Sequence, residues 1–236
     1  MRVIWLIGWN FLREQRLVLT IFVAWIFGFG LLFTFLHRPG ERTDDFLMLF
    51  RQQAAYGVAY AMLTSASAIH GERKSRRILA TLSKGLYRGE YLAGILLGTI
   101  LMTGFYFAGL GIVNEWFAWH FHFEAAIWPT LGALAVAALL VSSIAICFGT
   151  FAHPAFASTL TGILVAVPYV LSVVWGPRWQ QIIPAAGVVR SLVDYQFDTG
   201  WRGGTAFLPL AIVETVIFWF IGSRIFEQRD VTTSIE

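Results

Sequence analysis

The chain has 236 residues, of which 57% are hydrophobic, 16% aromatic and 13% charged, and its formal net charge is +3. Its mean hydropathy of +0.67 implies more apolar surface than a soluble domain of this length can bury, so the composition excludes a soluble protein and predicts an integral membrane protein. Long apolar runs favour spanning helices, because the strands of a β-barrel would instead alternate apolar and polar residues.

Residues 1–16 predict an amphipathic helix that lies on the inner membrane surface. Its polar and interfacial side chains share one stripe at helical spacing: Arg2, Trp9, Arg13 and Arg16. Its apolar side chains face the other way: Ile4, Ile7, Phe11 and Leu12. Trp and Arg at the level of the lipid headgroups suit such a helix. The alternative is that this segment extends the first membrane span.

Six apolar runs are long enough to cross a membrane. They cover residues 17–36, 46–69, 91–113, 130–152, 156–175 and 205–226. The second run is the least apolar, because Arg51, Gln52 and Gln53 lie near its start. We therefore expect an all-α membrane protein, a single permease-like domain over residues 1–236 with six transmembrane helices and an N-terminal interfacial helix.

The distribution of Lys and Arg orients these spans. With both termini in the cytoplasm, 11 of the 17 Lys and Arg residues would lie on the inner side and 6 on the outer side. The outer six are Arg38, Arg42, Arg51, Arg178, Arg190 and Arg202. The positive-inside rule therefore favours cytoplasmic termini, and an even number of spans agrees with that orientation.

The inner loop at 70–90 is the most unusual segment, because it places a charged block and an apolar stripe between two spans. The charged block comes first: Glu72, Arg73, Lys74, Arg76 and Arg77. The apolar stripe follows at Ile78, Leu79 and Leu82. Clustered basic residues would bind anionic lipid. The stripe instead favours a short helix that docks in a groove of a partner protein.

The outer segment at 176–204 predicts an amphipathic helix, which either lies on the outer surface or folds back as a re-entrant element. Its apolar residues recur at helical spacing: Ile182, Ala186, Val189, Val193 and Phe197. Its polar residues lie opposite: Gln181, Arg190, Ser191 and Asp194.

Glu214 is the only ionisable residue well inside a predicted span. It would serve either as a pathway group paired with a basic residue such as Arg51 or Arg190, or as one side of a hydrogen bond between helices. Gly94 and Gly98 form a GxxxG motif that lets two helices approach closely, within the chain or across a dimer.

Three further residues have mainly structural interpretations. Pro168 should kink the fifth span. Cys147, the only cysteine, predicts a small packing residue rather than a reactive thiol. His120 and His122 lie near Glu115 and Glu124, but two alternate histidines without a third spaced ligand do not make a metal site. We therefore assign no catalytic residue and no metal ligand.

Three stretches together resemble the type-2 family of ABC exporter permeases. The first is the inner loop, with Glu72-Arg73, Arg77, Leu79 and Leu82, and Arg88 just before the third span. It departs from the family at the turn, where Gly85 stands in place of the usual proline. The second is the outer segment, with Pro184, Arg190 and Gly200. The third is the ending Phe226, Arg229 and Asp230.

The resemblance implies that the inner loop is a coupling helix in a groove of a cytoplasmic ABC ATPase. Ile78, Leu79 and Leu82 would contact the groove. The polar rim would be Glu72, Arg73, Arg76 and Arg77. The short second inner loop at 151–156 would touch the ATPase less extensively.

The resemblance also implies the partners and the membrane. Two permease chains, most simply a homodimer, would work with two ATPase chains in a bacterial cytoplasmic (inner) membrane, in contact with lipid and not with nucleic acid. The chain contains no GxxxxGK[ST] phosphate loop, so ATP and Mg²⁺ would bind the partner ATPase and no cofactor is expected here. The alternative is a six-span membrane protein of another class, either an ATP-independent transporter or a membrane enzyme.

Overall fold

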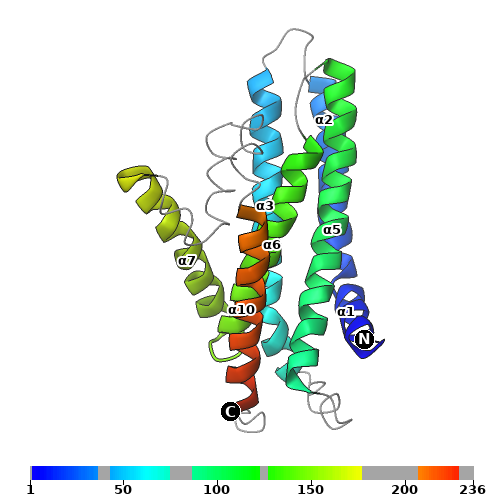
Figure 1. The fold of residues 1–236 in the computed structure, drawn as a ribbon. Coiled ribbons are helices and arrows are strands. Elements are labelled where there is room, and N and C mark those ends of the chain that lie inside the picture. The colour runs from blue at the N-terminus through cyan, green and yellow to red at the C-terminus, as the bar shows by residue number, and fades with distance from the viewer. Residues whose placement is uncertain (1, 37–42, 75–86, 123–126, 177–206, 229–236) are drawn as a thin grey trace.

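The computed structural model describes residues 2–36, 43–74, 87–122, 127–176 and 207–228, which are helical apart from short turns and contain no strand. Figure 1 shows these helices as one elongated bundle. The helices of these ranges are α1 (Arg2–Glu14), α2 (Arg16–Leu36), α3 (Thr43–Lys74), α5 (Arg88–Phe121), α6 (Ile127–Gly149), α7 (Pro154–Trp175) and α10 (Phe207–Gln228).

Four of these helices are long and apolar enough to cross a membrane, namely α5, α6, α7 and α10. A fifth span is possible if α1 and α2, which are bent by 61° at the break between them, count together. Helix α3 has 32 residues but is not among the apolar spans. The described helices therefore identify an integral membrane protein with four or five apolar spans, and they do not confirm the predicted six.

Helix α3 is less apolar because polar and ionisable side chains recur along it, including Arg51, Gln52, Gln53 and His70. Many of its buried residues are small: Ala54, Ala61, Ser65, Ala66 and Ala68. Small residues permit close helix approach. Helix α3 packs against α5, α6 and α7, and it also carries exposed residues such as Met48 and Leu63.

Helix α6 occupies the centre of the bundle and packs against α3, α5, α7 and α10. Hydrogen bonds tie several of these helices together. The Tyr106 hydroxyl of α5 donates to the Gln53 carbonyl of α3 at 2.7 Å. The Ser143 hydroxyl of α6 donates to the Thr215 carbonyl of α10 at 2.7 Å. Such bonds stabilise helix pairs in a membrane, where lipid offers no competing hydrogen-bond partner.

Two helix ends and one interior proline correct or refine the predictions. Helix α5 continues to Phe121, eight residues beyond the predicted end at residue 113. His120 is therefore helical rather than part of a loop, and His122 caps the helix with a left-handed φ of 59°. Helix α3 continues to Lys74, past the predicted end at residue 69. Helix α7 runs through Pro168 as one α-helix.

Candidate functional site at the basic end of the bundle

The basic end of the bundle is where α1, the last turn of α3, the first turn of α5 and the last turn of α10 lie (Figure 1). The predicted coupling loop joins α3 to α5 at this end. Glu72 and Arg73 belong to the last turn of α3, and Arg88 begins α5. The remaining predicted contact residues lie outside the described ranges: Arg76, Arg77, Ile78, Leu79 and Leu82.

Arg88 attaches the start of α5 to the C-terminal end of α10. Its Nη1 donates to the Phe226 carbonyl at 2.6 Å and to the Glu227 carbonyl at 3.0 Å. The last carbonyls of a helix have no partner within the helix, so a cation that binds them also matches the negative end of the helix dipole. The guanidinium carbon lies 5.6 Å from the centroid of the Phe226 ring. Two positions singled out separately in the sequence, Arg88 and Phe226, are thus in direct contact.

A cluster of buried side chains beneath Arg88, the basal cluster, joins five helices. Its members come from α1, α3, α5, α6 and α10: Phe11, Ala68, Ile69, Tyr91, Leu92, Ile95, Ile146 and Phe226. The Tyr91 and Phe226 rings stack with centroids 6.3 Å apart. The residues that follow the predicted coupling loop are therefore packed into the common core of the basic end.

Helix α1 lies directly on α5 through glycines. A Cβ added at Gly98 would lie 2.8 Å from the Gly8 carbonyl oxygen, and one added at Gly94 would lie 2.6 Å from Ile7 Cβ. Real Cβ atoms do not approach other atoms this closely, so both positions require glycine at the present helix spacing. The GxxxG motif of α5 is thus used for packing within the chain, and nothing here assigns it to a dimer interface.

The side chains of α1 are arranged as the sequence predicted. Phe11 and Leu12 are buried, whereas Trp9 and Arg13 are exposed, as is Arg16 at the start of α2. Together with the 61° break before α2, this arrangement fits a helix separate from the first span. Its location at the membrane surface stays a prediction.

Two histidines missed by the sequence argument connect α3 to the α6–α7 turn. The His70 and His153 ring centroids are 5.2 Å apart in an edge-to-face arrangement. His153 also caps α7, because its Nδ1 accepts a hydrogen bond from the Ala155 backbone N–H at 3.4 Å. The only local signal for this role was that His153 directly precedes Pro154, because proline favours the first position of a helix.

The remaining candidate residues take no part in the contacts of Arg88 or in the basal cluster. Glu214 lies on α10, and its Oε2 is buried without a hydrogen-bond partner in the described part of the chain. Neither an ion pair with Arg51 nor a hydrogen bond between helices is found for Glu214 there, and its pairing with Arg190 stays untested. Cys147 is buried, and its Cα would be 3.1 Å from a Cβ added at Gly222, so it packs where α6 meets α10. Pro184 and Arg190 lie outside the described residues.

The contacts at the basic end are hydrogen bonds, ring contacts and close glycine packing between helices. No group of three potential metal-ligating side chains occurs in the ranges that the structure describes. A scan against protein-family models and a search of curated proteins find no match to the chain. What the structure defines is the class, a helical integral membrane protein.

Proposed function

We propose that the chain is the transmembrane subunit of an ATP-driven ABC exporter. It forms the translocation pathway as a dimer, most simply a homodimer, and couples through residues 70–90 to a separate cytoplasmic ATPase that binds ATP and Mg²⁺. In this proposal α3 is the second of six spans. Both termini face the cytoplasm of a bacterial cell, and the protein lies in its cytoplasmic (inner) membrane.

The observation that carries this proposal is the contact between Arg88 and the end of α10. The two partners are 138 residues apart in the chain. If the loop ended in a flexible connection, a displacement imposed by a partner protein would not reach the spans. Here the loop ends in an arginine that binds two backbone carbonyls, and hydrogen bonds to charged groups are among the stronger ones in proteins. The contact supports a loop that transmits force to the spans.

The helix contacts suggest which elements would move together. A displacement of the start of α5 would carry α1 with it, because Gly94 and Gly98 bring the two helices into backbone contact. It would also carry the end of α10 through Arg88. The three helices α1, α5 and α10 would therefore respond as one unit to the ATPase.

The test is co-purification of an ATPase with the tagged chain from native membranes in mild detergent. The parent is compared with Leu79→Asp/Leu82→Asp, which removes the apolar stripe, and with Leu79→Met/Leu82→Met, which keeps it. We expect ATPase activity to elute with the parent and the methionine variant only. Absence of ATPase from every form, with each form eluting as a single folded species, would contradict the proposal and leave the loop as a lipid contact.

A further inference from the structure

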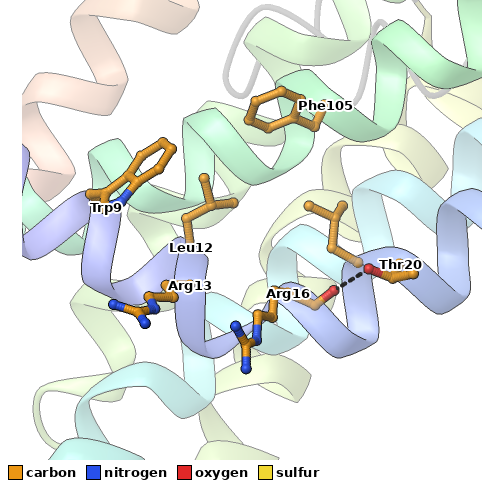
Figure 2. Close-up of a pocket in the computed structure, with 7 residues that line it drawn as sticks. Trp9, Leu12, Arg13, Arg16, Thr20 and Phe105 are labelled. Carbon is orange, nitrogen blue, oxygen red and sulfur yellow. Dashed lines mark hydrogen bonds between the residues drawn. The ribbon is translucent and has the colours of Figure 1, made fainter.

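An open groove lies at the elbow between α1 and α2, on the side that faces α5 (Figure 2). Its volume is about 450 Å³. The residues that line it come from all three helices: Trp9, Leu12, Arg13, Arg16, Leu19, Thr20 and Phe105. The chain bends by 61° between α1 and α2, and this bend leaves the groove open between these two helices and α5.

One rim of this groove is cationic. Arg13 and Arg16 are exposed, and Figure 2 shows both guanidinium groups on the same side of the elbow, away from the rings of Trp9 and Phe105. Neither arginine makes an ion pair within the part of the chain that the structure describes. Glu14 lies between them in sequence, so the elbow keeps a net positive charge. Two neighbouring cations repel each other, and an anion between them would relieve that repulsion.

The rest of the groove is apolar. Leu12 is buried and packs with Tyr60 and Met102. Phe105 and Trp9 are 54% and 48% exposed, so about half of each ring is free to contact another molecule. Trp rings gather at the boundary between lipid headgroups and acyl chains, where one end of the residue is apolar and the other polar. The groove therefore offers apolar walls directly beside a cationic rim.

We propose that the elbow binds one anionic glycerophospholipid of the bilayer. Its phosphate lies between Arg13 and Arg16, whose planar guanidinium groups can donate two parallel hydrogen bonds to phosphate oxygens. One acyl chain lies along Leu12, Leu19 and Phe105. A soluble anion would leave the apolar walls uncovered, and an uncharged lipid would leave the arginine pair uncompensated. The site goes beyond the transport proposal and does not depend on it.

The experiment measures lipid binding to the delipidated full-length chain by native mass spectrometry in a nonionic detergent. The probes are phosphatidylglycerol and phosphatidylcholine with identical acyl chains. We expect tighter binding of phosphatidylglycerol. Arg13→Gln should weaken that binding about fivefold and Arg13→Gln/Arg16→Gln about 25-fold, because each basic residue near a lipid surface contributes about 1 kcal/mol. Binding of phosphatidylcholine should change much less.

Two further variants separate the elbow from general basicity and from misfolding. Arg224→Gln removes an exposed arginine that lies near the same end of the bundle and pairs with Glu227 at 3.3 Å. It should keep phosphatidylglycerol affinity within about twofold, since exposed ion pairs contribute little. Thr20→Trp should fill the groove and weaken both lipids without a change of charge. Equal binding of the two lipids by the parent, full affinity in the double variant, or an equal loss with Arg224→Gln would each overturn the proposal.

Discussion

The basic end of the bundle and the second half of α7 are packed in opposite ways. At the basic end, the backbone of Gly8 in α1 lies directly against the backbone of Gly94 and Gly98 in α5. In the second half of α7, large side chains point away from the described residues, with Val173 and Trp175 60% and 67% exposed. Figure 1 shows the same contrast, because α7 leans away from the other helices.

Apolar side chains alone therefore do not bring membrane helices together. Lipid chains are as apolar as valine or leucine, so a large aliphatic side chain gains little by leaving lipid for protein. Glycine permits backbone contact, and arginine supplies hydrogen bonds that lipid chains cannot. The basic end has both glycine contacts and an arginine hydrogen bond, whereas the second half of α7 carries exposed valine and tryptophan side chains.

The largest expected effect comes from Gly98→Leu. The new side chain would collide with the Gly8 carbonyl and with Phe11, so α1 must move away from α5. We expect a loss of about 3 kcal/mol in stability, at the upper end for overpacked sites, measured by thermal unfolding in detergent. Gly104→Leu is the matched control on the same helix, because a Cβ there meets nothing within 4 Å. Equal melting of the two variants would mean that α1 does not rest on α5.

Arg88→Gln should have the next largest effect. It removes the charge-assisted hydrogen bonds to the Phe226 and Glu227 carbonyls and leaves those acceptors near the buried basal cluster. We expect a cost of about 2 kcal/mol, within the range for hydrogen bonds to charged groups. Hydrogen exchange should then increase at the C-terminal turn of α10. Arg224→Gln is the control, and a similar increase in both variants would contradict a specific contact.

Glu214→Gln tests a residue in the first half of α10. Its Oε2 is buried without a hydrogen bond among the described residues, and an unpaired buried polar group is costly. The amide keeps the shape without the charge, so we expect a gain of about 1 kcal/mol in stability, determined by denaturant titration in mixed micelles. Glu227→Gln, at an exposed position of the same helix, should change little. Destabilisation by Glu214→Gln would instead reveal a partner for the carboxylate.

The smallest effect is expected for Val173→Ala. The side chain is 60% exposed on α7, so its truncation should change stability by less than about 0.5 kcal/mol. Ala157→Leu is the contrasting variant, because Ala157 is fully buried at the start of the same helix and a larger side chain there would overpack the site. Melting curves of both, read by tryptophan fluorescence, test the contrast. A large effect of Val173→Ala would contradict an uncovered face on α7.

The site was only partly predictable from the sequence. The pattern of residues 1–16 predicted which side of α1 is buried, and the positions of Arg88 and Phe226 were singled out by motif. Their contact could not be predicted, because pairing across 138 residues depends on where α5 and α10 lie in space. The predicted groove contacts Ile78, Leu79 and Leu82 lie outside the described residues and stay predictions.

The sequence by itself determined the membrane class, the approximate positions of the helices and the amphipathic character of α1, because hydropathy and helical periodicity are properties of local residue order. Only the tertiary structure decided that α3 packs against α5, α6 and α7, that α5 continues to Phe121 and that the glycines of α5 contact α1. The physical reason is that packing distances and helix-end hydrogen bonds depend on neighbours distant in the chain. Apolar residue order alone does not specify those neighbours in a lipid environment.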